Sequence, residues 1–140
     1  MMSFFYLLEI SVSWALVALI WVVQLVHYPA FLYVDAGKAG AFHQMHTQQI
    51  TFIVMPLMLL ELGLAIWRCT QELPWLPACL PLVLVAAIWA STFFIQVPLH
   101  GQLGQQWDEA VIRKLINTNW LRTVLWTVKG GVLLWWMSNR

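Results

Sequence analysis

Four long apolar runs dominate the chain, and the short stretches between them hold most of its charged residues. The runs cover about residues 4–31, 47–67, 76–97 and 120–137. Each approaches or exceeds the ~20 mostly apolar residues with which a helix crosses a bilayer. The runs are continuously apolar and do not alternate, which favours helices over a β-barrel. The pattern therefore predicts an all-α, four-helix transmembrane bundle, built as a single domain over residues 1–140.

The three connections between these runs differ in character. Residues 32–46 contain two glycines and are predicted to form a loop, and residues 68–75 are predicted to form a tight turn. The third connection contains "WDEAVIRKLI", residues 107–116, which opens with acidic residues after its tryptophan and carries basic residues towards its end. One helical face of this segment is apolar: Trp107, Val111 and Leu115. We therefore expect a short amphipathic interfacial helix between the third and fourth spans.

Composition supports the membrane assignment and limits the partners. The chain is 61% hydrophobic and 9% charged, whereas soluble domains carry roughly 25% charged residues. A formal net charge of +1 and the lack of a long basic run argue against a nucleic acid partner. The expected partners are membrane lipids, a lipophilic small-molecule substrate and, in a homo-oligomer, further copies of the chain. The expected location is an integral position in a bacterial inner membrane.

All four histidines of the protein fall on one side of the predicted topology. His27 lies near the end of the first span, His43 and His46 lie just before the second, and His100 lies just past the third. Two short stretches also resemble each other at this side, "QLVHYPAF" at 24–31 and "QVPLHGQL" at 96–103. Two related hairpins packed as a bundle would bring both stretches together.

These histidines are candidate metal ligands. His43 and His46, three residues apart, share one helical face if the helix begins before them. Imidazole is a common ligand of copper, iron and zinc, and His27 and His100 would complete the set. The alternative is that all four are hydrogen-bonded polar residues at the membrane interface, with no ligand.

Further polar residues lie at the depth of the histidines. Gln24 and Gln96 each precede a histidine by about one turn, so that their amides could orient the imidazoles of His27 and His100. Asn119 adds another amide at this level. Alternatively, these side chains cap helices or line a wet vestibule.

Arg122 and two aromatic residues are the candidates for contact with a substrate. A guanidinium at this depth could bind a carboxylate, a phenolate or a propionate, or reach the lipid phosphates instead. Tyr28 and Trp120 could stack on a planar aromatic ligand or anchor the interface. The sequence leaves these alternatives open.

Two ionisable residues lie deep inside the predicted spans. Glu61 and Lys129 are expected to form an ion pair between the second and fourth helices, because charges at such depth face a partner or a cavity. The alternative makes Glu61 a proton carrier. Glu9 lies near the opposite interface, where no special role is expected. Cys69 and Cys79 flank one short loop and could pair in an oxidising compartment or remain free thiols.

The distribution of Lys and Arg predicts the orientation. The histidine side carries Lys38, Arg113, Lys114 and Arg122, and the opposite side carries Arg68 and Arg140. By the positive-inside rule, the histidine side is cytoplasmic.

The order of "HYP", "QVPLHGQL" and "NWLRTVLW" along the chain resembles the DUF1772 group of small four-helix membrane proteins, related to the anthrone-oxygenase-like family. The resemblance implies oxidation of an aromatic substrate by dioxygen, and it points to His27, His100, Trp120 and Arg122. A weaker resemblance, a histidine on the first helix of a small bundle, is to the four-helix membrane family that oxidises protoporphyrinogen and binds a b-type haem.

The function expected from the sequence is that of a membrane oxidoreductase that uses oxygen and acts on a lipophilic aromatic or quinone-like substrate. Its centre would be a copper or iron ion held by His27, His43, His46 and His100, with Arg122, Tyr28 and Trp120 around the substrate. One alternative is a haem b protein with His27 and His100 as axial ligands. The other is a non-catalytic membrane subunit that binds a lipid or a partner.

Overall fold

The computed structural model describes residues 4–71 and 76–139, and in these two stretches all regular secondary structure is helical. The all-α prediction is therefore confirmed. The helical elements follow one another as α1 (Phe4–Val22), η1 (Val23–His27), α2 (Tyr28–Ala30), η2 (Phe31–Tyr33), α3 (Ala39–Gln71), α4 (Leu76–Ser91), η3 (Thr92–Gln96), α5 (Val97–Gln105) and α6 (Glu109–Ser138). Together they form four long rods: α1 to η2, α3, α4 to α5, and α6.

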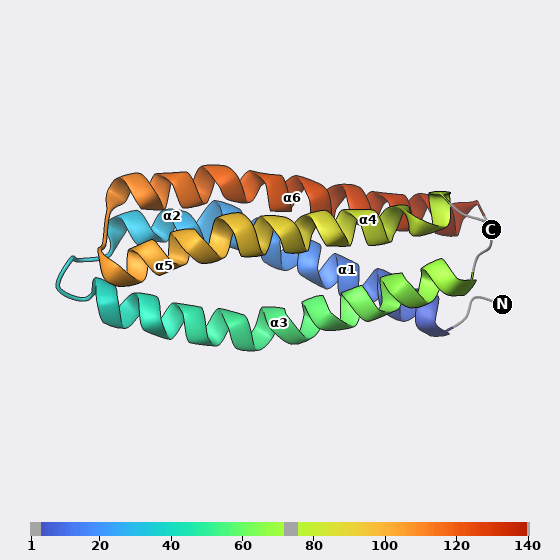
Figure 1. Ribbon diagram of the computed structural model, residues 1–140, viewed down its shortest axis with the longest axis horizontal. Coiled ribbons are helices and arrows are strands. Elements are labelled where there is room, and N and C mark those ends of the chain that lie inside the picture. The colour runs from blue at the N-terminus through green and yellow to red at the C-terminus, as the bar shows by residue number, and fades with distance from the viewer. Residues whose placement is uncertain (1–3, 72–75, 140) are drawn as a thin grey trace.

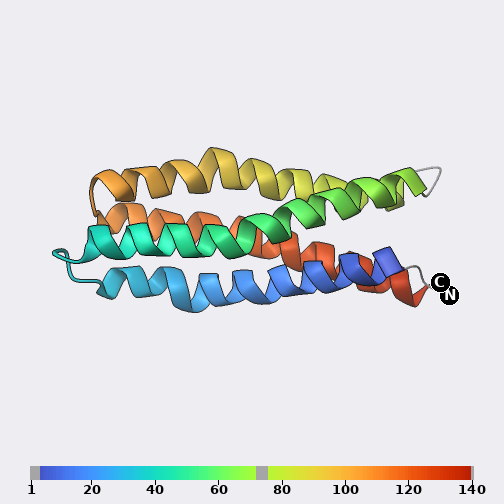
Figure 2. The same ribbon diagram turned by 90° about the horizontal axis from the view of Figure 1, so that it is seen from below.

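The rods pack side by side as a bundle (Figure 1). The first rod contacts α3 and α6, and α4 contacts the same two helices. Both chain termini lie at one end, and the loop before α3 lies at the other end with the connection between α5 and α6; the view turned by 90° agrees (Figure 2). We call these the terminal end and the loop end.

Three of the rods are long and apolar enough to cross a membrane. These segments are Phe4–Tyr33, Ala39–Gln71 and Ala78–Gln105, and they contain most of the first three predicted spans. The fourth rod, α6, is not among the candidate spans of the described residues. Arg122 and Lys129 interrupt its apolar stretch and lower its hydropathy.

Two predicted boundaries are wrong. Helix α3 begins at Ala39, so that the loop predicted over residues 32–46 ends earlier. Helix α6 runs unbroken from Glu109 to Ser138, so that residues 109–116 form its first turns and no separate interfacial helix exists there. The Asp108 carboxylate caps this helix by accepting the backbone N–H of Ala110 at 2.7 Å. The predicted turn at 68–75 lies partly outside the described residues, because 72–75 are not described.

The apolar face of the first turns of α6 packs inside the protein rather than on a membrane surface. Ile112 and Leu115 are buried in the core, and Trp107 stacks on Phe31 with ring centres 5.6 Å apart. The amphipathic pattern is therefore satisfied by contact with the first rod.

A π-helical segment precedes a proline in each of two rods. Segment η1 is followed by Tyr28 and Pro29, and η3 is followed by Val97 and Pro98. Proline has no N–H to donate, so that the preceding turn widens where the regular bond is lost. These are the two stretches whose sequences resemble each other. His27 and His100 therefore lie in similar local structure, each within four residues of a π-helical segment or inside it, in the first and third rods.

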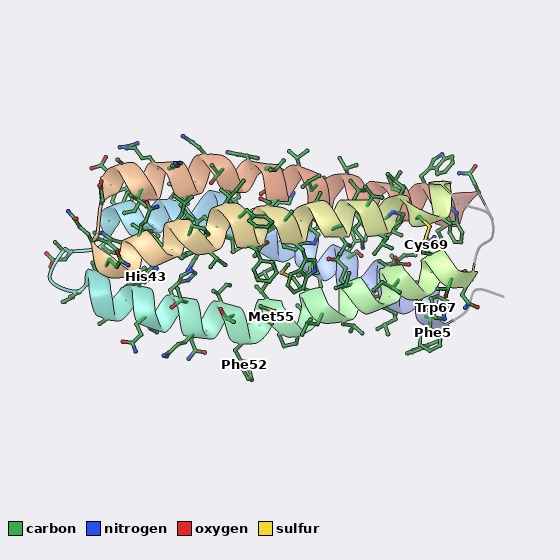
Figure 3. All side chains as sticks on the ribbon, viewed as in Figure 1. Phe5, His43, Phe52, Met55, Trp67 and Cys69 are labelled. Carbon is green, nitrogen blue, oxygen red and sulfur yellow. A yellow bond between two sulfur atoms is a disulfide. The ribbon has the colours of Figure 1, made fainter. Side chains whose placement is uncertain are left out.

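The terminal end of the bundle is held by a disulfide between Cys69 and Cys79, which joins the end of α3 to the start of α4. Cys69 and His43 lie near opposite ends of the bundle (Figure 3). Between them, α1 and α6 approach closely at Gly130, where an added Cβ would lie 3.3 Å from atoms of Trp14 and Val17. A small residue is needed at this contact.

Candidate functional site

All four histidines meet at the loop end of the bundle. His27 Nε2 lies 2.5 Å from His46 Nδ1, and His43 Nε2 lies 3.3 Å from His100 Nδ1. The ring centres of His46 and His100 are 5.6 Å apart, so that the two pairs adjoin. We call these residues the histidine cluster. It gathers side chains from three rods, as the topology of the sequence predicts.

Two features of the helices turn this cluster inwards. Because α3 begins at Ala39, His43 and His46 lie one turn apart on a formed helix, and their exposed fractions are only 7% and 3%. Phe31 packs against the cluster: its ring centre lies 5.0 Å from that of His46, and its side chain is fully buried. The imidazoles of His43 and His46 are therefore shielded from the surroundings.

Tyr28 and Arg122 extend the cluster towards the middle of the bundle. The Tyr28 hydroxyl lies 3.1 Å from His100 Nε2, within hydrogen-bonding distance. Arg122 lies within hydrogen-bonding reach of Tyr28, and its guanidinium carbon is 5.2 Å from the centre of the Trp126 ring. The Nε atom of Arg122 is buried and has no hydrogen-bond partner. A donor is thus left free at the inner edge of the cluster.

A cavity of about 140 Å³ begins at this edge. Its polar end is formed by Tyr28, Gln96, His100 and Arg122. Its remaining walls are mainly apolar and come from α1, η1, α3, α5 and α6: Leu16, Leu19, Ile20, Val23, Ile50, Val54, Met55, Met58, Val97 and Trp126. Met55 lies midway along α3 (Figure 3). The cavity can hold an apolar body with one polar group directed at the histidine cluster.

The three amides of the polar layer bind neighbouring helices rather than histidines. Gln24 donates to the carbonyl of Ile116 at 3.1 Å and accepts from the Asn119 amide at 2.9 Å. Gln96 donates to the Thr118 hydroxyl at 3.1 Å. All these partners lie on α6. The amides therefore fasten the first and third rods to the fourth and fix the walls of the cavity.

Trp120 is the candidate that the structure leaves outside the site. Its side chain is 41% exposed and meets Trp21 edge to face, with ring centres 5.7 Å apart. Its indole does not line the cavity. The position fits an anchor on the outer face of the bundle.

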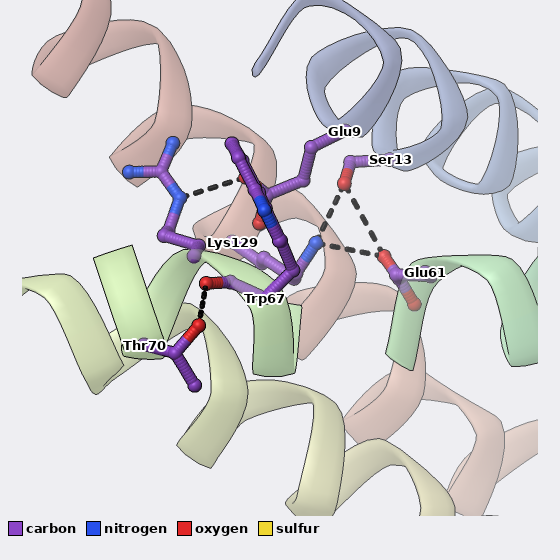
Figure 4. A network of polar contacts seen from close by, with 7 residues as sticks. Glu9, Ser13, Glu61, Trp67, Thr70 and Lys129 are labelled. Atoms are coloured by element: carbon purple, nitrogen blue, oxygen red, sulfur yellow. Dashed lines mark hydrogen bonds and ion pairs between the residues drawn. The ribbon is translucent and has the colours of Figure 1, made fainter. Parts of the chain in front are cut away.

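A second polar network lies towards the terminal end (Figure 4). Lys129 Nζ donates to Glu61 Oε1 at 3.0 Å and to the Ser13 hydroxyl at 2.6 Å, which confirms the predicted ion pair. Arg68 Nε donates to Glu9 Oε2 at 2.7 Å, and neither side chain of this pair is more than 1% exposed. The expectation that Glu9 has no special role is therefore wrong.

The donor chemistry of the histidine cluster suits a metal ion, although its present geometry does not. Among the described residues, no three His, Cys, Asp or Glu side chains are arranged to hold an ion. The 3.3 Å between His43 Nε2 and His100 Nδ1 equals the spacing of about 3.3 Å expected for two nitrogens bonded at 2.0–2.1 Å to a tetrahedral ion. The Nε2 atom of His46 is buried without a partner. Binding would require the pair of His27 and His46 to separate.

Comparison of the chain with models of protein families, with curated proteins and with solved structures finds no match. The resemblance to the DUF1772 group accordingly stays a prediction.

Proposed function

We propose that the chain is an integral membrane oxidoreductase that uses dioxygen and holds a copper or iron ion in the histidine cluster. Its substrate is a lipophilic aromatic or quinone-like molecule that occupies the adjoining cavity. One observation carries the proposal: four clustered imidazoles, of which those of His43 and His46 are buried, adjoin an apolar cavity whose polar end presents Arg122 and Tyr28. Buried polar side chains in so apolar a protein are costly and mark functional sites.

The proposal includes α6 as the fourth membrane span. Arg122 and Lys129 lower its mean hydropathy, but both side chains are buried within the bundle. The exposed residues on its outer surface are largely apolar and suit contact with lipid: Trp120, Leu121, Val124, Val128, Leu134 and Trp135. A helix whose charges face inwards can cross a bilayer beside three apolar neighbours.

Two observations support an orientation with the histidine cluster towards the cytoplasm. The disulfide of Cys69 and Cys79 lies at the terminal end, and disulfides persist in oxidising compartments outside the cytoplasm. Lys38, Arg113 and Lys114 lie at or near the loop end, as the positive-inside rule requires of a cytoplasmic side.

The side chains around the cavity have separate roles in this proposal. The histidines would hold the ion, which would supply one-electron and dioxygen chemistry. Arg122 holds the oxygen atom of the substrate and stabilises negative charge on it. The hydrogen bond between Tyr28 and His100 keeps a proton next to that oxygen. The apolar walls exclude water from the reaction. The implied chemistry of the DUF1772 resemblance agrees with these roles.

The haem alternative has less support. The two candidate axial ligands are already engaged: His27 Nε2 contacts His46, and the two ring nitrogens of His100 contact His43 and Tyr28, whereas an axial ligand must direct a free ring nitrogen at the haem iron. The third candidate, a subunit without catalysis, is distinguished by the experiment below.

The test is oxygen uptake by the purified protein loaded with copper or iron, with a lipophilic hydroquinone as the electron donor. We expect uptake that depends on the metal and is lost in the His43→Ala/His46→Ala double variant. Gln44→Ala/Gln48→Ala is the matched control, since both glutamines lie exposed on the same helix. Equal uptake in both double variants, or none above the free metal in the wild type, would contradict the proposal.

A further inference from the structure

Three cationic side chains, those of Arg68, Arg122 and Lys129, are buried in the described part of the chain. Arg68 is paired with a carboxylate at 2.7 Å, and Lys129 is paired with another at 3.0 Å. Arg122 has no carboxylate partner among the described residues. The two buried pairs are neutral as units, so that the guanidinium of Arg122 leaves one positive charge without balance inside the bundle.

Such a charge is unfavourable unless something compensates for it. Burial removes most of the hydration of an ion, and an isolated charge in an apolar interior is strongly destabilising. The neighbours of Arg122 compensate only partly, because Tyr28 is a neutral phenol and Trp126 offers the face of its ring. The exposed fraction of Arg122 is 7%, so that water contributes little.

The guanidinium also faces the cavity with an unused donor. Arg122 is one of the residues that line the cavity, and its Nε has no hydrogen-bond partner. Gln96 lines the same polar end, is 1% exposed, and its Oε1 likewise has no partner. The cavity therefore offers a charged donor and a neutral acceptor, both buried and both free, next to an apolar body.

We propose that the cavity binds a lipophilic organic anion, whose carboxylate or phenolate pairs with Arg122 and whose neighbouring hydroxyl donates to Gln96. A carboxylate or phenolate oxygen balances the buried charge and accepts from Nε. The apolar part of the ligand extends between α1 and α3 towards Met58. An ortho-hydroxy aromatic acid and the monoanion of a catechol both have this arrangement of groups. A neutral quinone leaves Arg122 unbalanced.

This inference rests on the proposed function for its chemistry, because it names the substrate class of the same site, but binding itself needs no metal. A phospholipid also carries an anion. The small organic anion is favoured because the free acceptor of Gln96 beside Arg122 matches a hydroxyl donor, which a phosphodiester group itself lacks.

The experiment measures binding of hydroxynaphthoate to the detergent-purified full chain, stripped of metal by a chelator, with isothermal titration calorimetry. Hydroxynaphthamide, which has the same shape and no charge, is the matched ligand. We expect the anion to bind at least tenfold more tightly than the amide. In Arg122→Gln, binding of the anion should weaken roughly tenfold to hundredfold, as the loss of a charged hydrogen bond predicts. Arg122→Lys should retain most of the affinity.

Arg113→Gln is the control variant, because Arg113 is an exposed cation on the same helix and pairs with Glu109. It should bind the anion as the wild type does. Equal affinity of the wild type for anion and amide would overturn the inference, even if Arg122→Gln failed to fold. Displacement of the anion by phosphatidylglycerol, but not by a short aromatic acid, would overturn it in favour of a lipid site.

The two proposals fail separately in this design. Selective binding of the anion by a protein that never holds metal would leave the anion site standing and remove the oxidoreductase. Metal-dependent oxygen uptake by a protein that binds the anion no more tightly than the amide would support the oxidoreductase and overturn the anion site.

Discussion

The buried pair of Glu61 and Lys129 offers the sharpest test of the fold. Both side chains are fully buried, and their ion pair of 3.0 Å joins α3 to α6 in the half of the bundle away from the histidines. Glu61 also accepts the indole N–H of Trp126 at 3.0 Å, so that the pair adjoins the floor of the cavity. The perturbation is Lys129→Met, which keeps the length of the side chain and removes its charge.

The expected loss of stability follows from the buried Glu61 carboxylate that Lys129→Met leaves without a cation. Without Lys129, the carboxylate of Glu61 keeps its bond from Trp126 and a weaker one from Ser13 at 3.4 Å, but no cation faces it. Breaking one side of a buried pair typically costs ~3–5 kcal/mol, because an uncompensated charge remains. Replacing both partners, as Glu61→Gln/Lys129→Met, should return the stability to within ~1 kcal/mol of the wild type.

The assay is reversible unfolding in mixed micelles of increasing denaturing detergent, followed as a double-mutant cycle. The control is the exposed pair of Arg113 and Glu109, whose side chains are 63% and 66% exposed, and Glu109→Gln should cost no more than ~0.5 kcal/mol. Single variants that each cost less than ~1 kcal/mol, and that add in the double variant, would refute the reasoning.

Three further predictions follow from the packing. Arg122→Met should stabilise the ligand-free protein by at least ~1 kcal/mol in the same unfolding assay, because it removes an unbalanced buried charge; a loss of stability would show that the charge is balanced within the protein. Gly130→Leu should cost ~1–3 kcal/mol, because an added side chain collides with Trp14 and Val17, while Gly131→Leu, which meets open space, should not. Cys69→Ser/Cys79→Ser should lower the free energy of unfolding by ~2–3 kcal/mol, because the disulfide closes a loop with a sequence separation of 10 residues. In the wild type, after reduction, a membrane-impermeant maleimide should label both cysteines from outside intact cells; labelling only after lysis would contradict the proposed orientation.

The histidine cluster and the Glu61–Lys129 pair were predictable from the sequence because both depend on depth along the bundle. Alternating helices fix which ends meet, and the regular rise of a helix fixes which charges share a level. Neither inference needs the rotation of a helix about its axis.

The role of Gln24 was not predictable because it depends on that rotation. Gln24 lies one α-helical turn before His27 in sequence, but η1 contains both, and a π-helical turn rotates everything after it by an extra residue. The amide therefore faces α6 while His27 faces His46. Counting positions at 3.6 residues per turn fails across such a segment.

The first turns of α3 and α6 were missed for a different reason. Hydropathy marks where a helix enters the hydrocarbon and not where it begins, so that the stretch from Ala39 to His46, with its glycine and polar residues, resembles a loop in the sequence. An amphipathic pattern also does not distinguish a membrane surface from a neighbouring helix, and residues 109–116 pack on the bundle. The pair of Glu9 and Arg68 was accessible in principle, since both residues lie near the terminal end of adjacent spans.

The most direct test of the account is the content of copper, iron and zinc per chain in protein purified without chelators or metal-binding tags. We predict close to one copper or iron ion per chain in the wild type and in Gln44→Ala/Gln48→Ala, and none in His43→Ala/His46→Ala. Metal at background level in the folded wild type, or unchanged metal in the histidine double variant, would contradict the claim that the histidine cluster is a metal centre.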